Sequence, residues 1–361
     1  METGTLLVTG GAGFIGTNLV RHLVTATLYR VVVLDVLSYA GRRENLADLE
    51  GDARFAFVHG SIGDRTLLDA LLARERPRAI LNLAAETHVD RSIDDPRPFL
   101  QTNVHGTFAL LEAARSHWSR LGSAAREAFR FLHVSTDEVY GSLAPGTRAR
   151  EGSPFAPSSP YAASKAASDH LVLAWQHTFG LPVLVTNCSN NFGPYQFPEK
   201  LIPLMLKNAI EGRPLPIYGD GGNVRDWLFV EDHCEALVRV LEAGRPGARY
   251  NVGAEQELTN RELVARLCAV LDSERPARAN EALRARAIPS YETLVTHVAD
   301  RPGHDRRYAL DATQLKRELG WTPRFAFEDA LRRTVRWYLE RPDWGGEQHR
   351  RRLGAAAGAR A

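Results

Sequence analysis

The sequence predicts an α/β protein with a doubly wound parallel sheet and a second, smaller α/β lobe. Short, mostly apolar runs alternate with helix-like segments through the first half of the chain, as strands covered on both faces do. The first run leads directly into a glycine-rich turn, and later runs end in polar clusters. Alternation of this kind gives parallel strands joined by helices, with ligands beyond the carboxyl ends of the strands.

Size and composition indicate an ordinary globular protein. The 361 residues are 44% hydrophobic and 24% charged, enough to bury a sizeable core in one large unit or two lobes. The net charge of +2 gives no electrostatic reason to expect nucleic acid or a membrane surface as a partner. Without a leader-like or membrane-spanning apolar run, we expect a cytoplasmic protein, in which Cys188, Cys234 and Cys268 are buried thiols.

The first predicted strand, residues 5–9, runs into glycines at positions 10, 13 and 16. Gly10, Gly13 and Gly16 match a dinucleotide-binding turn, which needs a tight bend, close backbone approach to the pyrophosphate and close helix–strand packing. A helix that begins near Phe14 would direct its free N–H groups and positive dipole end at the phosphates.

A second strand, residues 30–34, ends in Asp35, nineteen residues after Gly16. A carboxylate at this position binds ribose hydroxyls and repels a 2′-phosphate, so the spacing favours NAD over NADP. The alternative is an ordinary turn residue at the end of a strand. The strand, turn and helix that precede Asp35 favour the ribose role.

Three further strands are predicted at residues 55–58, 79–83 and 129–134, each followed by a polar cluster. The third leads into the adjacent carboxylates Asp137 and Glu138. One can serve as general acid and the other as general base if their environments separate their pKa values. The alternative is that one of them caps the following loop.

No Gly or Pro lies between Tyr161 and Phe179, so we expect a helix with Tyr161 and Lys165 on one face. An ammonium beside the phenol, together with a cationic nicotinamide ring, would favour the phenolate. That form can take a proton from an alcohol while hydride leaves the same carbon. Taken alone, Tyr-x-x-x-Lys is more often an ordinary exposed pair, but the chain has only four lysines.

Eight short motifs together resemble the extended short-chain dehydrogenase/reductase superfamily. They are TGGAGFIG at 9–16, AAETHVDRS at 84–92, STDEVYG at 135–141, SSPYAASK at 158–165, NNFGPY at 190–195, PEKL at 198–201, RDW at 225–227 and DRPGHD at 300–305. Within the superfamily the chain resembles the dTDP-glucose 4,6-dehydratases, from about residue 6 to about residue 338. Thr136-Asp137-Glu138 is the most specific element, because relatives that only epimerise C4 usually lack both carboxylates.

The resemblance implies a reaction and a role for each catalytic group. Tyr161, assisted by Lys165 and Thr136, takes the C4 hydroxyl proton as hydride passes to NAD. Glu138 then removes the C5 proton, Asp137 protonates the departing C6 hydroxyl, and hydride returns to C6. The product is a 4-keto-6-deoxy sugar, and a tightly retained NAD is expected.

The resemblance also implies binding residues and no metal. For NAD they are Gly10, Gly13, Phe14, Ile15, Gly16, Asp35, Ser38, Ser61, Ile62, Leu83, Ala84, Ala85, Thr102, Tyr161, Lys165 and Asn190. For the nucleotide sugar they are Thr87, Asn191, Lys200, Leu201, Pro216, Ile217, Tyr218, Arg225, Asn260, Asp300, Arg301 and His304. Ser61 and Thr87 depart from the family's usual aspartate and serine, and neither change removes a chemical step.

We expect residues 1–190, with about 226–250, to form an NAD-binding Rossmann domain. Residues 191–345 would form most of an interleaved, smaller α/β substrate-binding lobe, with a strand at 250–253 and a helix at 260–271. We expect a solvated connection at 272–286 and a flexible tail at 346–361. By resemblance, helices near 98–116 and 160–179 form a homodimer interface.

Two other functions stay open. A UDP-sugar 4-epimerase or decarboxylase shares the oxidation step, and the Asp137-Glu138 pair argues against it. A non-catalytic NAD-binding regulatory protein keeps the fold without turnover, and Tyr161 with Lys165 argues against that. Thymidine and uridine differ by one methyl, a discrimination worth roughly 1–3 kcal/mol, so both nucleotides stay open.

Overall fold

The computed structural model of the protein describes residues 3–344 and confirms the predicted α/β architecture. Seven strands form one parallel sheet in the order β10-β6-β5-β4-β1-β2-β3. They are β1 Thr3–Thr9, β2 Leu28–Asp35, β3 Phe55–His59, β4 Ala79–Asn82, β5 Arg130–Thr136, β6 Val183–Cys188 and β10 Arg249–Val252. The strand order reverses between β1 and β4, the point at which ligands bind in such sheets. The tail predicted at 346–361 lies outside the described residues.

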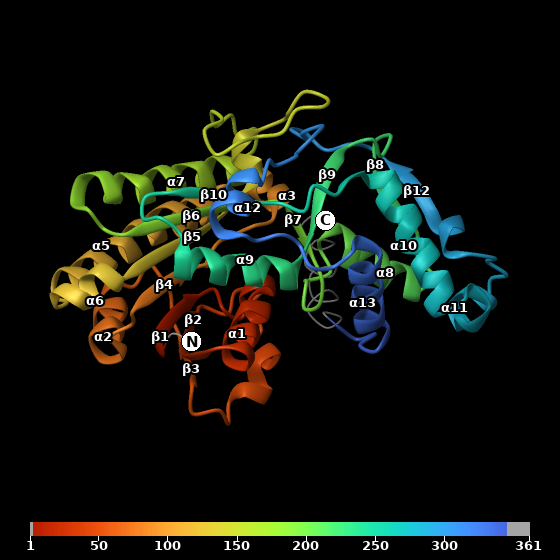
Figure 1. Ribbon diagram of the computed structural model, residues 1–361. Helices are drawn as coiled ribbons and strands as arrows, with labels where there is room; N and C mark the ends of the chain where they lie inside the picture. The colour runs from red at the N-terminus through yellow and green to blue at the C-terminus, as the bar shows by residue number, and fades with distance from the viewer. Residues whose placement is uncertain (1–2, 345–361) are drawn as a thin grey trace.

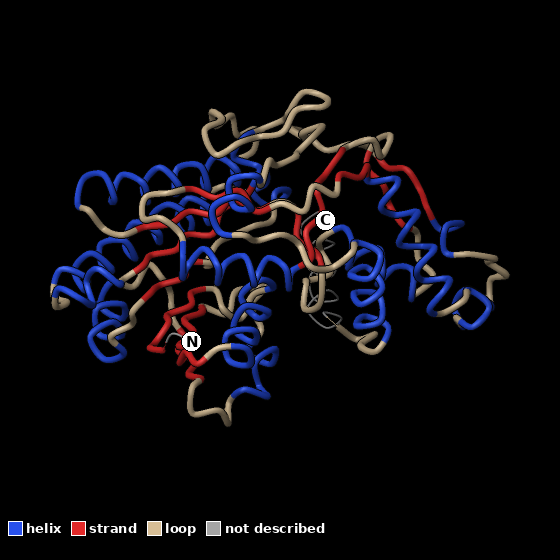
Figure 2. The backbone as a smooth tube through the Cα atoms, in the orientation of Figure 1, coloured by secondary structure: helices blue, strands red, loops and turns tan. Residues whose placement is uncertain are grey.

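Helices cover both faces of this sheet (Figures 1 and 2). Alternate strand residues enter two separate cores: Leu6 and Val8 belong to one, and Leu7 belongs to the other. The first core is covered by α1 Phe14–Ala26 and α9 Val230–Ala243, and the second by α2 Arg65–Glu75, α5 Thr107–Ser119 and α7 Pro160–Phe179. The sheet is therefore doubly wound, as predicted.

Strand β5 is longer at its carboxyl end than the apolar pattern predicts. Ser135 and Thr136 continue the strand, because they pair with Asn187 and Cys188 of β6. The chain then turns into a 3-10 helix, η3 Asp137–Tyr140. The register of β6 thus fixes where the two carboxylates leave the sheet.

The helix predicted near 98–116 is a composite. It begins as α4 Arg97–Phe99, passes through a π-helical segment, η2 Leu100–Gly106, and continues as α5. The Ser168 hydroxyl of α7 donates to the Asn103 carbonyl at 2.6 Å within the π-helical segment. Helix propensity and apolar spacing do not predict a π-helical segment here, because the segment is supported by a contact from another helix.

The smaller lobe contains two small sheets and the helices α8, α10, α11 and α13, which lie at the right of Figure 1. One sheet has the order β11-β9-β7 and the other pairs β12 with β8. These strands are β7 Asn190–Phe192, β8 Leu215–Tyr218, β9 Val224–Phe229, β11 Glu257–Thr259 and β12 Val295–Val298. The remaining helices are η1 Arg43–Leu49, α3 Val89–Asp94, α6 Ser123–Ala128, α8 Leu201–Ile210, α10 Asn260–Glu274, η4 Ala277–Ala279, α11 Glu281–Arg284, η5 Tyr291–Leu294, α12 Thr313–Leu319 and α13 Phe327–Leu339.

The solvated connection predicted at 272–286 is wrong. Ala277, Asn280 and Leu283 are buried, and the Asn280 side chain donates to the Ile210 carbonyl at the end of α8. The high content of Glu, Arg and Ala suggested exposure to solvent, but Ala277, Asn280 and Leu283 are spaced three residues apart and all face inward. The segment is folded against the smaller lobe.

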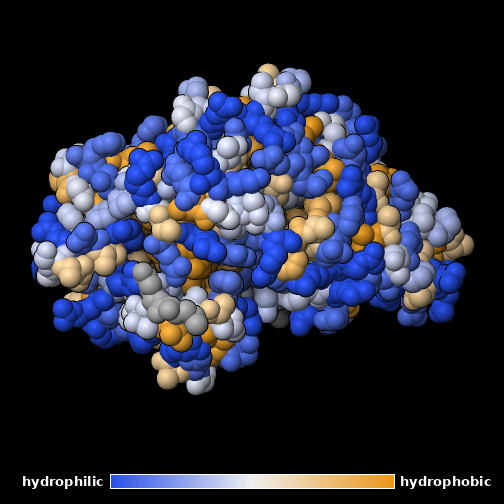
Figure 3. Space-filling view, in the orientation of Figure 1, coloured by the Kyte–Doolittle hydropathy of each residue, from blue (hydrophilic) through white to orange (hydrophobic). Residues whose placement is uncertain are grey.

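The three cysteines are free and buried, as predicted. On the face shown in Figure 3, hydrophilic residues predominate and hydrophobic residues are scattered among them. Within residues 3–344, no helix combines the length and the apolar character that crossing a membrane requires.

Asp226 on β9 gives a prediction for the pH dependence of stability. Its Oδ1 accepts a hydrogen bond from the Gln256 backbone N–H at 2.8 Å, and burial raises its pKa from 3.8 to about 6. The folded state therefore binds this proton more tightly than the unfolded state does. The free energy of unfolding therefore falls as pH rises from about 4 to about 6, because the folded protein must then bury the Asp226 carboxylate. Above pH 6 this loss of stability is complete.

Asp226→Asn keeps the acceptor for Gln256 and carries no charge. We expect the free energy of unfolding of this variant, relative to that of the wild type, to rise by about 2–3 kcal/mol between pH 4 and pH 6. Denaturant unfolding of both proteins at several pH values measures the difference. A difference that stays constant between pH 4 and 6 would contradict the prediction.

Candidate active site

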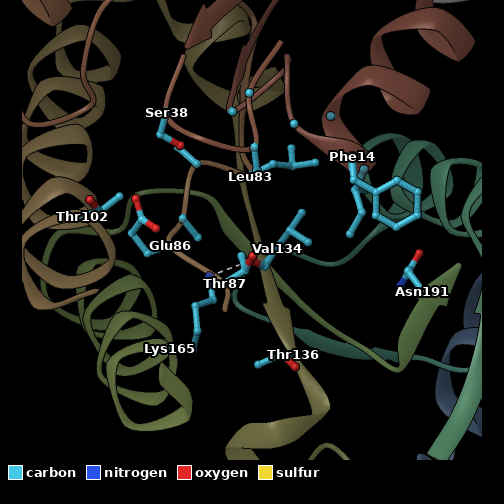
Figure 4. A pocket seen from close by; sticks show the side chains of 18 of the residues that line it. Phe14, Ser38, Leu83, Glu86, Thr87, Thr102, Val134, Thr136, Lys165 and Asn191 are labelled. Carbon is cyan, nitrogen blue, oxygen red and sulfur yellow. Dashed lines mark hydrogen bonds between the residues drawn. The ribbon is translucent and has the colours of Figure 1, made fainter. Parts of the chain in front are cut away.

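A cavity of about 500 Å³ lies at the carboxyl ends of the strands on both sides of the reversal point (Figure 4). Every residue predicted to be catalytic or to bind NAD lines it. Of the residues predicted to bind the nucleotide sugar, Thr87, Asn191 and Lys200 line it as well. The others lie outside its lining, so their roles stay predictions: Leu201, Pro216, Ile217, Tyr218, Arg225, Asn260, Asp300, Arg301 and His304.

The glycine turn that ends β1 is closely packed. Gly10 has a φ of +69°, and a Cβ there would lie 2.7 Å from the Ala84 backbone nitrogen. A Cβ at Gly16 would lie 2.1 Å from the Gly10 carbonyl oxygen. Larger residues would push the turn and α1 apart. The glycines therefore bring the helix N-terminus to the wall of the cavity.

We expect Gly16→Ala to destabilise the fold by about 1–3 kcal/mol and to empty the cavity of dinucleotide, because backbone must move to admit the methyl. Thermal unfolding and the NAD content of the purified protein measure the two effects. Gly152→Ala is the matched control, since a Cβ there meets nothing within 4 Å. Wild-type NAD content in Gly16→Ala would contradict the prediction.

Asp35 is buried at the end of β2 and lines the cavity. Its Oδ2 accepts from the Ala12 backbone N–H at 2.9 Å, and its Oδ1 accepts from the Leu37 N–H at 2.8 Å. Burial raises the pKa of this carboxyl. Each oxygen keeps a further lone pair, so Asp35 both holds the turn and can accept ribose hydroxyls. Gly41, which the sequence reasoning missed, packs closely against Oδ1.

Thr136 caps the 3-10 helix that carries the two carboxylates. Its hydroxyl oxygen accepts from the Glu138 N–H at 3.3 Å and lies 3.2 Å from Asp137 Oδ1. Because Thr136 caps the start of the 3-10 helix, neither Asp137 nor Glu138 is needed as its N-terminal cap. Both side chains line the cavity.

The environments of the two carboxyl groups differ. Burial and the neighbouring Glu138 charge raise the pKa of Asp137 well above its ordinary value. Burial also raises the pKa of Glu138, but Lys200, Arg225 and Arg301 oppose that rise. These surroundings favour Asp137 over Glu138 as the group that holds a proton.

Tyr161 and Lys165 lie in the first turns of α7, which begins with Ser159 accepting from the Ala162 N–H at 3.1 Å. Both are buried, Tyr161 at 7% exposure and Lys165 at 3%, so the pair is not an exposed one. Burial and the Glu138 charge raise the pKa of Tyr161 well above 10, and a hydrogen bond from Thr136 opposes the rise.

The side chain of Lys165 reaches from α7 back to the sheet. Its Nζ donates to the Val134 carbonyl on β5 at 2.9 Å (Figure 4), and it lies 3.4 Å from His133 Nε2. Lys165 lines the same cavity as Tyr161. That the ammonium assists the phenol stays a prediction.

Two of the arginines predicted to bind the sugar nucleotide have partners within the protein. Arg225 stacks on the Tyr308 ring at 4.3 Å and donates to the Asp305 carbonyl at 2.9 Å. Arg301 forms an ion pair with Asp90. These cations still act on the cavity, because both oppose the rise in the Glu138 pKa.

Part of the cavity wall was missed from the sequence. Gln196, Phe197 and Glu199, in the loop between β7 and α8, line it beside the predicted Lys200. Lys200 Nζ donates to the Thr87 carbonyl at 2.8 Å, which closes this loop onto the end of β4. The prolines at 194 and 198 marked a loop, but its direction depends on the packing of the two lobes.

The chain is similar to known proteins over most of its length. The family model described as GDP-mannose 4,6 dehydratase matches residues 7–334. The chain is 58% identical to a dTDP-glucose 4,6-dehydratase of Xanthomonas campestris pv. campestris (strain B100) and 51% identical to dTDP-glucose 4,6-dehydratase 1 of Escherichia coli (strain K12), over 94% of each chain. The crystal structure of a dTDP-glucose 4,6-dehydratase from Streptomyces venezuelae with NAD and TYD bound has a TM-score of 0.84 and 46% identity, and covers 95% of this chain and 99% of that one.

Proposed function

The chain belongs to the dTDP-glucose 4,6-dehydratase family, and we propose that it converts dTDP-glucose to dTDP-4-keto-6-deoxyglucose. It is an NAD-dependent hydro-lyase. The observation that carries the proposal is the pair Asp137 and Glu138, which lies in one cavity with Tyr161 and whose environments separate the two pKa values.

The residues of the cavity fit NAD. The glycine turn brings the N-terminus of α1 to the cavity wall, where it can bind the pyrophosphate, and Asp35 keeps acceptor capacity for a ribose. Asn190, which also lines the cavity, adds a buried Oδ1 with no hydrogen-bond partner among the described residues. When bound, NAD supplies the hydride acceptor that takes hydride from C4 and returns it to C6, and its positive ring favours the Tyr161 phenolate.

Tyr161 is proposed as the base for the C4 hydroxyl. The Thr136 hydroxyl favours its ionised form, against the burial and the Glu138 charge that disfavour it. Lys165, which lines the same cavity, is proposed to assist it with its positive charge. The ketone that forms at C4 acidifies C5. Glu138 then takes the C5 proton, while Asp137, which holds its proton, gives it to the departing C6 hydroxyl. The 4-epimerase alternative is not favoured, because epimerisation has no use for this acid and base.

The cations in and near the cavity are proposed to bind the diphosphate. Lys200 lines the cavity, and Arg225 and Arg301 lie near enough to act on Glu138. Guanidinium groups suit phosphate oxygens because they offer several fixed donors. The predicted neighbours Leu201, Pro216, Ile217, Tyr218, Asn260, Asp300 and His304 are proposed to complete the nucleotide-sugar site.

We also propose that the enzyme is a cytoplasmic homodimer whose two functional parts are the NAD-binding domain, residues 1–190 with about 226–250, and the substrate-binding lobe, 191–345. Large exposed apolar residues support the dimer: Leu100 is 49% exposed, Phe108 46% and Phe179 42%, all on η2, α5 and α7. Exposed apolar groups on neighbouring helices are typical of an interface. Three free buried thiols are consistent with a reducing compartment.

The test is mass spectrometry of dTDP-glucose incubated with the purified protein and no added cofactor, with UDP-glucose in parallel. We expect the sugar to lose the mass of one water, faster for the thymidine nucleotide. An unchanged mass with inversion at C4 would replace the proposal by the epimerase. No turnover, even with NAD supplied, would favour a binding protein.

A further inference from the structure

A cluster of buried ionisable side chains lies directly behind Lys165, and no step of the proposed reaction uses it. It consists of His133 on β5 and Asp169, one turn after Lys165 on α7. The side chains of His133 and Asp169 are 1% and 0% exposed. Burying ionisable groups together is costly unless they satisfy one another. Their arrangement therefore calls for a role.

The imidazole of His133 lies between the ammonium and the carboxylate. Its Nε2 is 3.4 Å from Lys165 Nζ and 3.5 Å from Asp169 Oδ1. The other carboxylate oxygen, Asp169 Oδ2, accepts from Asn187 Nδ2 at 3.0 Å. Because Lys165 Nζ also donates to the Val134 carbonyl, the ammonium is fixed at one point relative to the carboxylate.

Asn82 determines which imidazole nitrogen carries the proton. Its Oδ1 accepts the Thr9 hydroxyl at 2.7 Å, so its amide nitrogen faces His133 Nδ1 at 3.1 Å and donates to it. Burial holds the pKa of His133 well below 6.5, so the ring is neutral. A neutral ring that accepts at Nδ1 carries its proton on Nε2, the nitrogen that lies 3.5 Å from Asp169 Oδ1.

We propose that Asp169, steadied by His133, is the counter-charge that keeps Lys165 in its ammonium form within the protein interior. Asp169 and His133 are positioning residues, because neither side chain lines the cavity. The inference rests on the proposed function, since it explains how a buried lysine can supply the positive charge that the oxidation at C4 requires.

The charges of the two groups depend on each other. Burial lowers the pKa of Lys165, and the Asp169 charge opposes that fall. Burial likewise raises the pKa of Asp169, and the Lys165 charge and the Asn187 hydrogen bond oppose that rise. The other titratable groups near the ammonium are Tyr161, on the same helix, and Cys188 on β6, whose thiol pKa is raised by burial. Without Asp169, a buried ammonium loses its main compensation.

The test uses the small number of lysines. The chain contains Lys165, Lys200, Lys207 and Lys316 alone, so lysine labelled with ¹³C at the ε-carbon gives four resonances. Lys165→Arg identifies the signal of interest in the holoenzyme. In the wild type we expect this signal to stay that of an ammonium at neutral pH. In Asp169→Asn, which keeps an acceptor for Asn187, we expect its pKa to fall by at least about one unit.

Turnover of dTDP-glucose gives a second readout. Asp169→Asn should lower kcat about tenfold and move the alkaline limb of the kcat–pH profile to lower pH, because the lysine loses its proton sooner. KM should change little, since Asp169 does not line the cavity. Asp329→Asn, at an exposed carboxylate on α13, is the control and should leave both the profile and the lysine signal unchanged.

Two results would overturn the inference: a wild-type Lys165 that is already neutral at neutral pH, or a Lys165 titration that Asp169→Asn does not move. The first result does not depend on Asp169→Asn, so the inference stays testable even if that variant does not fold. A lysine signal that behaves as expected in a protein that does not dehydrate dTDP-glucose would uphold the charge pairing and reject the proposed function.

Discussion

Replacing Glu138 with glutamine is expected to slow the dehydration of dTDP-glucose about a thousand-fold while leaving the oxidation at C4 intact. Glu138 is proposed to remove the C5 proton, and an amide cannot do so. Tyr161 and Lys165, which serve the earlier step, keep their contacts with Phe99 and Val134. The bound cofactor should therefore accumulate in its reduced form when substrate is added.

Stopped-flow recording of the near-ultraviolet absorbance of NADH, together with product analysis, measures both parts of this expectation. Glu340→Gln is the matched control, because Glu340 has a side chain 69% exposed and lies far along the chain at the end of α13. Rapid dehydration by Glu138→Gln would remove Glu138 from the mechanism and leave another group as the base.

Tyr161→Phe is expected to reduce turnover by a similar factor, about 10²–10⁴, but without any reduced cofactor. The phenol is proposed to take the first proton, so its loss stops the reaction before C5 becomes acidic. In the wild type the Tyr161 ring makes an edge contact with Phe99, with the two ring centroids 6.3 Å apart. The phenyl ring of the variant should keep this contact and stay in place. Stability should therefore change little.

The same stopped-flow and product assays separate the two variants. Glu138→Gln should give reduced cofactor and almost no product, whereas Tyr161→Phe should give neither. Substrate binding, measured by calorimetry, should remain in both proteins. Reduced cofactor in Tyr161→Phe would show that another group accepts the C4 hydroxyl proton.

The sequence predicted the first strand–turn–helix–strand unit and its place in the cavity wall well, because the determinants of this unit are local. Gly10, Gly16 and Asp35 act within one strand–turn–helix–strand unit, and their spacing reflects the packing that the structure shows. The apolar runs that predicted the strands also gave the alternating faces of the sheet, since each strand is covered on both sides.

Features that depend on contacts between distant segments could not be predicted in this way. The π-helical segment that carries Thr102 is supported by Ser168 of another helix. The contact of Lys165 with Val134 follows from the distance between α7 and β5, which the spacing of Tyr161 and Lys165 within one helix does not give. The wall formed by Gln196, Phe197 and Glu199 depends on how the two lobes meet.

The central claim is that one protein oxidises C4, removes water and returns the same hydride to C6. Incubation of dTDP-glucose that carries deuterium at C4, followed by mass spectrometry and NMR of the product, tests it most directly. We predict that the deuterium appears in the C6 methyl group of a 4-keto product, with solvent hydrogen at C5. Deuterium retained at C4 of a sugar that keeps its water would contradict the account, and so would deuterium lost to added cofactor.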